Sequence, residues 1–210
     1  MPTQKTTEPQ PLTLATKVTI IRLLGVPVFI LLLLYYGRSL AAHEPEHWLR
    51  WSALALFVTI AATDALDGYL ARSRNEITWL GRVLDPLADK ALSLAGILLL
   101  SRPSLPELQP QFPVWFIWLV ISRDAITIGG VFLIDFLTGT VTVRPRISGK
   151  AATFFVMIAI GLALAGVPDT LFHSFVGMAA FLIFLSFILY LRDGWLQLDR
   201  GHLKPTTPES

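Results

Sequence analysis

Six long apolar segments, joined by short polar connections, make up most of the chain. Each runs for roughly 20 residues, the length that an α-helix needs to cross the hydrocarbon of a bilayer. The pattern predicts an all-α fold, a polytopic membrane helix bundle with six transmembrane helices. The predicted spans are residues 17–36, 51–71, 84–101, 113–137, 148–166 and 171–191.

Both ends of the chain are polar and contain proline, so we expect flexible ends at about 1–15 and 200–210. The connections between the spans are too short for a separate soluble domain. Residues 1–210 are therefore predicted to form a single membrane domain.

Composition agrees with a membrane protein: the chain is 53% hydrophobic and 15% charged, with a mean hydropathy of +0.60. Ordinary soluble domains carry about 25% charged residues. These values exclude the disordered, collagen-like and disulfide-scaffold classes. The chain has no cysteine, which removes disulfides, thiolate metal sites and cysteine nucleophiles. A formal net charge of +2 gives no argument for a nucleic-acid partner, and we expect none.

Lysine and arginine are distributed unevenly between the connections. Eleven lie in the head, the second and fourth connections and the tail, whereas three lie in the first and third connections and none in the fifth. Cytoplasmic loops of membrane proteins carry the excess of basic residues. We therefore predict that both termini face the cytoplasm and that the protein is integral to the cell (inner) membrane.

Four aspartates lie in or next to the second and third spans, where a charge facing lipid would cost about 2.5–3.5 kcal/mol. They are Asp64, Asp67, Asp85 and Asp89. The first two are three residues apart and the last two are four apart, so each pair lies on one face of its helix. A short connection makes the two helices antiparallel neighbours, and we expect the four carboxylates to share a cavity.

Four converging carboxylates repel one another unless positive charge lies between them. Ligand sets made only of oxygen favour hard cations, and two divalent ions would balance four negative charges. The sequence therefore predicts a site for two Mg²⁺ or Mn²⁺ ions. A purely structural interpretation stays open, in which Asp85 caps a helix ahead of Pro86 and Lys90 pairs with Asp64 or Asp67.

Arg72 places a planar cation beside the predicted metals, an arrangement that suits a diphosphate. The small residues Gly68, Ala71 and Gly81 either let the helices pack closely or leave room for a ligand. Together these residues predict phosphoryl-type chemistry at a site that is reachable from the cytoplasm.

The same residues spell D-x-x-D-G-x-x-A-R-x₈-G-x-x-x-D-x-x-x-D, which resembles the signature of the CDP-alcohol phosphatidyltransferase family. Eight positions are fixed within 26 residues, and the six spans resemble the family's architecture over most of residues 15–191. The eight positions are Asp64, Asp67, Gly68, Ala71, Arg72, Gly81, Asp85 and Asp89.

The resemblance implies that Asp64, Asp67 and Asp85 ligate two divalent ions, and that Asp89 shares the metal site and acts as the catalytic base. The implied reaction belongs to phospholipid biosynthesis. An alcohol hydroxyl attacks the β-phosphorus of CDP-diacylglycerol, which gives a phosphodiester lipid and CMP. Membrane lipids, and a second copy of the chain in a homodimer, are further expected partners.

The resemblance also implies a binding site for the CDP-lipid. The cytidine would lie over Gly68 and Ala71, while Arg72 would hold the diphosphate. The residues assigned to this site are Gly68, Ala71, Arg72 and Gly81.

Basic residues on the fourth and fifth spans form a candidate pocket for a phosphate of the acceptor alcohol. They are Arg123, Arg144, Arg146 and Lys150. Two structural interpretations stay open. Arg144 and Arg146 would anchor the fifth span under the positive-inside rule, and Arg123 would pair internally with a carboxylate.

Two groups within the family supply the acceptor hypotheses. Residues 149–153 resemble the G-K-x-x-T element of phosphatidylglycerophosphate synthases, and Thr16, Thr19 and Arg22 resemble their N-x-x-T-x-x-R motif, with Thr16 in place of Asn. This resemblance implies glycerol 3-phosphate as the acceptor.

The sequence also departs from that group at Val156, which replaces Gln, and at Asp124, which replaces Glu. Arg123 and Asp124 equally resemble cardiolipin synthases, so phosphatidylglycerol is the alternative acceptor. A cation or proton transporter is a remote alternative, because transporters also bury carboxylates. A transporter would not need Arg72 or Gly68, and residues 113–191 contain no second aspartate cluster.

Overall fold

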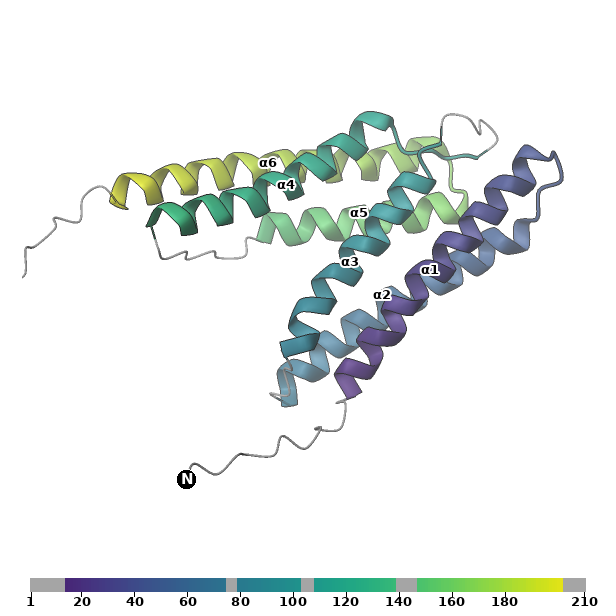
Figure 1. Ribbon diagram of the computed structural model, residues 1–210. Coiled ribbons are helices and arrows are strands. Elements are labelled where there is room, and N and C mark those ends of the chain that lie inside the picture. Colours follow the sequence, from purple (N-terminus) through teal and green to yellow (C-terminus); the bar gives the residue numbers. More distant parts are fainter. Residues whose placement is uncertain (1–13, 75–78, 103–107, 139–146, 202–210) are drawn as a thin grey trace, which may run out of the picture. The chain divides into compact units, whose positions relative to one another are not determined.

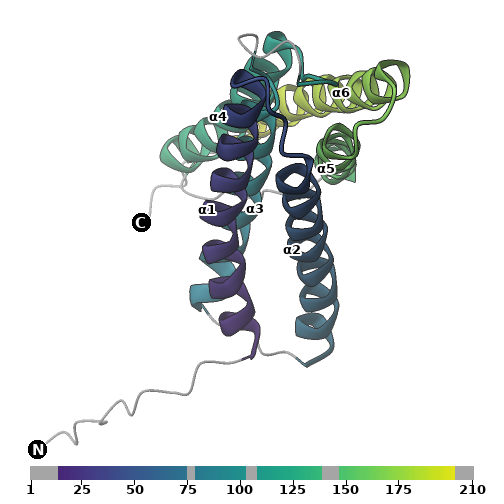
Figure 2. The same cartoon turned by 90° about the vertical axis from the view of Figure 1, so that its right-hand side faces the viewer.

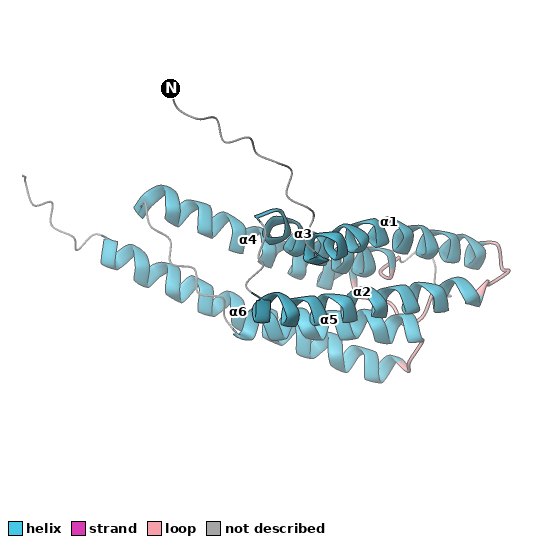
Figure 3. Cartoon of the chain, turned by 90° about the horizontal axis from the view of Figure 1, so that it is seen from below, coloured by secondary structure: helices cyan, strands magenta, loops and turns pink. Residues whose placement is uncertain are grey.

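The computed structural model describes the backbone of residues 14–74, 79–102, 108–138 and 147–201, and the side chains of residues 24–63, 88–102, 108–127, 129 and 149–192. Helices are the regular secondary structure of these residues (Figures 1 and 3). They are α1 (Leu14–Ala41), α2 (His47–Arg74), α3 (Trp79–Leu99), α4 (Val114–Thr138), α5 (Ile147–Ala165) and α6 (Asp169–Gly201). Each predicted span falls on one helix, so the all-α prediction is confirmed for this part of the chain.

Two helices carry described stretches that are long and apolar enough to cross a membrane, Leu24–Ala41 of α1 and Asp169–Arg192 of α6. The apolar stretch Gly149–Ala165 of α5 is shorter. Large apolar side chains lie on the outside, with Trp118 exposed to 68% and Leu24 to 65%. A surface that faces lipid needs such side chains, whereas soluble proteins expose few large apolar patches. The structure fits a membrane protein, and the six-span arrangement stays a prediction.

The chain folds as two compact units that divide after Leu99. In the first unit, α1 packs along both α2 and α3 (Figure 2). The rings of Phe29 on α1 and Phe57 on α2 are buried with their centroids 5.8 Å apart. Gly25 permits a close approach of the two helices, because a Cβ there would lie 2.8 Å from Cδ1 of Ile60. This unit holds the two helices that carry the aspartate pattern.

Backbone hydrogen bonds of a Schellman motif close the turn between α1 and α2. The N–H of Glu44 donates to the carbonyl of Ser39 and the N–H of His43 donates to the carbonyl of Leu40, both at 3.0 Å. His43 adopts the left-handed conformation, with φ at 58°. The hydroxyl of Ser39 also accepts a hydrogen bond from the N–H of Glu46 at 3.1 Å. The chain therefore reverses direction in an ordered turn.

In the second unit, α6 packs along α5 and along α4. The buried side chains of α5 include Ala152, Ala159 and Ala163, and small residues let membrane helices approach closely. Gly166 ends α5 in the left-handed conformation, with φ at 71°, and the N–H of Val167 donates to the carbonyl five residues earlier at 3.4 Å. This turn fixes the antiparallel pairing of α5 and α6.

Cysteine labelling tests the predicted topology, since the chain has no native cysteine. Glu46 lies in the exposed turn between α1 and α2, which we expect on the outer side of the membrane. Glu46→Cys should react with a membrane-impermeant maleimide in intact cells, and Thr3→Cys should react only after permeabilisation. Labelling of Glu46→Cys that requires permeabilisation would contradict the topology and the cytoplasmic placement of the aspartates.

Candidate active site

The two aspartate pairs lie on helices at one end of the first unit (Figure 1). Asp64 and Asp67 belong to the last turns of α2, and Asp85 and Asp89 to the first three turns of α3. The connection 75–78 joins the two helix ends and can span roughly 18 Å at most. The helical backbone places the members of each pair one turn apart on one face.

The capping interpretation of Asp85 is wrong. α3 begins at Trp79, six residues before Asp85, whereas an N-cap residue lies at the boundary of its helix. Pro86 lies inside α3 and has no N–H, so the carbonyl of Arg82 lacks its intrahelical donor. A helix cap therefore does not account for this carboxylate.

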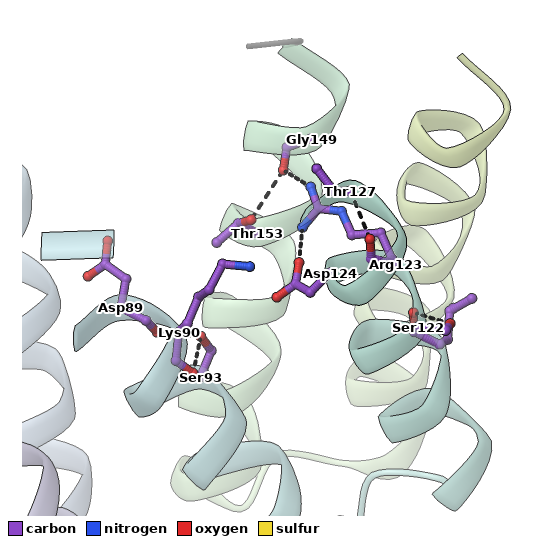
Figure 4. A network of polar contacts seen from close by, with 10 residues as sticks. Asp89, Lys90, Ser93, Ser122, Arg123, Asp124, Thr127, Gly149 and Thr153 are labelled. Atoms are coloured by element: carbon purple, nitrogen blue, oxygen red, sulfur yellow. Dashed lines mark hydrogen bonds and ion pairs between the residues drawn. The ribbon is translucent and has the colours of Figure 1, made fainter. Parts of the chain in front are cut away.

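Seven predicted site residues have side chains outside the described residues. They are Asp64, Asp67, Gly68, Ala71, Arg72, Gly81 and Asp85. The side chain of Asp89 is described and is half-buried on α3, and its backbone carbonyl accepts a hydrogen bond from the hydroxyl of Ser93 (Figure 4). The roles assigned to the aspartates and to Arg72 stay predictions.

The donor set of the aspartate pattern fits a hard divalent cation, because all four donors are carboxylate oxygens and each helix presents two of them on one face. Among the described side chains, no group of three or more His, Cys, Asp or Glu residues is placed to hold a metal ion. The metal centre is therefore a prediction from the sequence pattern and the two helices that carry it.

Arg123 lies on α4 in the second unit, and its guanidinium reaches the start of α5 (Figure 4). Nη1 donates to Oδ1 of Asp124 at 3.0 Å and Nη2 donates to the carbonyl of Gly149 at 3.3 Å. The side chains of Arg123 and Asp124 are 18% and 19% exposed. The internal ion pair is thus present, yet an arginine has five N–H donors and these bonds use two. Nε is buried without a partner among the described residues.

The other predicted acceptor residues divide into two groups. Lys150 is exposed in the first turn of α5, next to Gly149. Arg144 and Arg146 lie outside the described residues. The structure therefore brings Arg123 to the end of α5 that carries Lys150.

Sequence reasoning missed Ser186 on α6. Its buried hydroxyl has no hydrogen-bond partner among the described residues, and it lies 3.5 Å from the position that a Cβ on Gly149 would take. The signal in the sequence is a serine inside the long apolar segment 171–191.

Comparison with known proteins assigns this chain to a class of proteins. The sequence model of the CDP-alcohol phosphatidyltransferase family matches residues 12–195, which include the whole aspartate pattern and most of both units. The chain therefore belongs to the CDP-alcohol phosphatidyltransferase family.

Individual relatives carry more specific names. The chain is 32% identical over 154 residues to a CDP-diacylglycerol--glycerol-3-phosphate 3-phosphatidyltransferase of Bacillus subtilis, covering 72% of this chain and 76% of the relative. A protein of the same name from Pseudomonas fluorescens is 30% identical over 194 residues, covering 86% and 89%. A cardiolipin synthase (CMP-forming) of Streptomyces coelicolor is 31% identical over 155 residues, covering 73% and 65%.

Proposed function

We propose that this protein makes phosphatidylglycerophosphate in phospholipid biosynthesis, by transferring the phosphatidyl group of CDP-diacylglycerol to glycerol 3-phosphate with release of CMP. The observation that carries the proposal is the complete aspartate pattern on α2 and α3 of a chain that belongs to this family. The names of the Bacillus and Pseudomonas relatives support glycerol 3-phosphate as the acceptor.

In the proposed reaction, the acceptor hydroxyl oxygen bonds to the β-phosphorus of the CDP-lipid. The bond from that phosphorus to the bridging oxygen breaks, and the bridging oxygen leaves with CMP. Asp89 takes the hydroxyl proton, which is the task of a general base. Asp64, Asp67 and Asp85, together with Asp89, hold two Mg²⁺ or Mn²⁺ ions. When bound, these ions stabilise the negative charge that develops on the phosphate oxygens.

The CDP-lipid is proposed to bind across the end of α2 and the start of α3. Arg72 binds the diphosphate, because a planar guanidinium matches phosphate oxygens with two N–H groups. Gly68 and Ala71 leave room for the cytidine, and Gly81 contributes from α3.

The acceptor phosphate is proposed to bind at Arg123 and the start of α5, with Lys150, Arg144 and Arg146. Arg123 supports this assignment because three of its five N–H donors lie beyond its bonds to Asp124 and Gly149. The first N–H groups of a helix and its dipole also favour an anion at the N-terminal end of α5.

Cardiolipin synthesis from phosphatidylglycerol is the second candidate function. An open cavity of about 210 Å³ lies beside Arg123 between α4 and α6, and most of its lining is apolar. The lining residues are Leu119, Ser122, Arg123, Ile126, Ile183, Phe184 and Phe187. Apolar walls next to a cation suit an acceptor that carries acyl chains, and the Streptomyces relative is named a cardiolipin synthase.

We further propose that the two units form one domain in the cell (inner) membrane, with six spans, both termini and the active site on the cytoplasmic side. The family match supports a single domain because it runs across the division after Leu99. A homodimer is part of this proposal.

The transporter alternative leaves the fixed Gly68 and Arg72 of the pattern without a role.

Substitution of the predicted acceptor residues tests this function. Arg123→Ala and Arg144→Ala should raise the KM for glycerol 3-phosphate about ten- to a hundredfold, because a charged hydrogen bond to phosphate is worth roughly 1.5–3 kcal/mol. The KM for CDP-diacylglycerol should change less. Arg38→Ala, at an exposed position in the last turn of α1, is the control and should leave both constants unchanged. If the wild-type protein ignores glycerol 3-phosphate and converts phosphatidylglycerol, cardiolipin synthesis replaces the first proposal.

A further inference from the structure

The carbonyl oxygen of Gly149 is a meeting point of two helices in the second unit (Figure 4). It accepts a hydrogen bond from Nη2 of Arg123 on α4 at 3.3 Å and one from the hydroxyl of Thr153 on α5 at 3.1 Å. The two outer residues of the G-K-x-x-T element are therefore bonded to each other, and the same oxygen holds the arginine.

Gly149 also makes room for the guanidinium. A Cβ at this position would lie 2.9 Å from Nη2 of Arg123, which is closer than real Cβ contacts allow. The guanidinium is tied to Asp124 on its other side, at 3.0 Å. An alanine at 149 would therefore push the guanidinium out of its present place.

Ser186 adds an unpaired hydroxyl next to the same glycine. Its side chain is fully buried, with 0% exposure, and its Oγ has no hydrogen-bond partner among the described residues. The Nε atom of Arg123 is also buried without a hydrogen-bond partner among the described residues. Buried polar groups without partners destabilise a protein, so the hydroxyl beside Gly149 and the Nε of the arginine that Gly149 binds indicate a place that a ligand oxygen completes.

We propose that Gly149 and Thr153 are positioning residues that fix the guanidinium of Arg123 for the acceptor's phosphate, and that Ser186 offers its hydroxyl to a phosphate oxygen. This inference rests on the proposed function, and it names the residues that set specificity for a phosphorylated acceptor. Gly149 acts through its carbonyl and its missing side chain, and Thr153 acts by holding that carbonyl.

Gly149→Ala is the first test. It should raise the KM for glycerol 3-phosphate at least tenfold and leave the KM for CDP-diacylglycerol within about twofold. Gly129→Ala on α4 and Gly177→Ala on α6 are matched controls, since a Cβ at either position meets nothing within 4 Å. The controls should leave both constants near the wild-type values. A Gly149→Ala protein that behaves like the controls overturns the inference.

A double-mutant cycle separates positioning from general damage. Arg123→Lys removes the Nη2 that a Cβ at 149 would meet. Gly149→Ala should therefore raise the KM for glycerol 3-phosphate much less in the Arg123→Lys protein than in the wild type. If the KM increases of the two single variants multiply in the double variant, Gly149 does not act through Arg123.

Ser186→Ala distinguishes phosphate binding from a purely structural role, because the two roles predict different changes in Tm and in the KM for glycerol 3-phosphate. Removing a buried unpaired hydroxyl should leave the Tm unchanged or raise it. The same substitution should raise the KM for glycerol 3-phosphate several-fold. A lowered Tm with an unchanged KM would assign Ser186 to packing and overturn its part of the inference.

Binding of glycerol 3-phosphate by isothermal titration, with CMP and Mg²⁺ present, distinguishes this inference from the proposed function. If the wild-type protein binds glycerol 3-phosphate but does not convert it, the proposed function fails. The inference then stands or falls on whether Gly149→Ala weakens binding at least tenfold. If the wild-type protein does not bind glycerol 3-phosphate, the phosphate site at Arg123 is wrong and the inference fails.

Discussion

Asp89→Asn is expected to lower kcat by about 10²–10⁴-fold, the usual effect of removing a general base, while the affinity for CDP-diacylglycerol stays near the wild-type value. Asparagine keeps the shape of the side chain and removes its charge and basicity. Asp89 lies one helical turn beyond Asp85 on α3, and its side chain is half-buried. The kcat and the binding of CDP-diacylglycerol by isothermal titration with Mg²⁺ present give the two readings.

Asp67→Asn is the matched comparison, because it makes the same chemical change at a proposed metal ligand. It should weaken Mg²⁺ binding and CDP-diacylglycerol binding together, since the diphosphate is held through the ions. If Asp89→Asn loses CDP-lipid binding as completely as Asp67→Asn, Asp89 is principally a metal ligand and its assignment as the base is wrong.

Chelation is expected to abolish turnover completely and reversibly. Four carboxylates without histidine or cysteine favour hard divalent ions, so excess EDTA should stop the reaction, and added Mg²⁺ or Mn²⁺ should restore it. The measurement is the rate of CMP release as a function of free metal concentration. Asp85→Asn should need a higher Mg²⁺ concentration for half-maximal rate, whereas Arg38→Ala should not. Full activity in excess EDTA would remove the two-metal proposal.

The sequence was sufficient to place the helices but not their ends. Each apolar run predicts a helix because its length matches a membrane, and each falls on one helix of the structure. α6 continues ten residues past the predicted end at 191. Its 33 residues span about 50 Å, whereas the hydrocarbon is about 30 Å thick, so the helix extends beyond the segment that an apolar window can detect. Polar residues continue that helix outside the apolar window. The same effect extends α3 back to Trp79, which is why the capping interpretation of Asp85 failed.

The aspartate pattern and the contacts of Arg123 differ in how far the sequence predicts them. The aspartate pattern is local, since fixed spacings on two helices joined by a short connection define it. The contacts of Arg123 depend on how α4, α5 and α6 pack, and they join residues 26 positions apart. Hydrophobic periodicity does not specify such packing. Arg123 was therefore predicted as a candidate, while its contact with Gly149 and the burial of Ser186 became evident only in the structure.

The most direct test of phosphatidyl transfer is one reaction of the purified protein with CDP-diacylglycerol, Mg²⁺ and equal amounts of glycerol 3-phosphate and phosphatidylglycerol. The lipid products are resolved by mass spectrometry and the CMP is quantified. We expect phosphatidylglycerophosphate as the main new lipid, with one CMP released for each molecule formed. Cardiolipin as the main product would contradict the acceptor, and the absence of both lipids and of CMP would contradict phosphatidyl transfer itself.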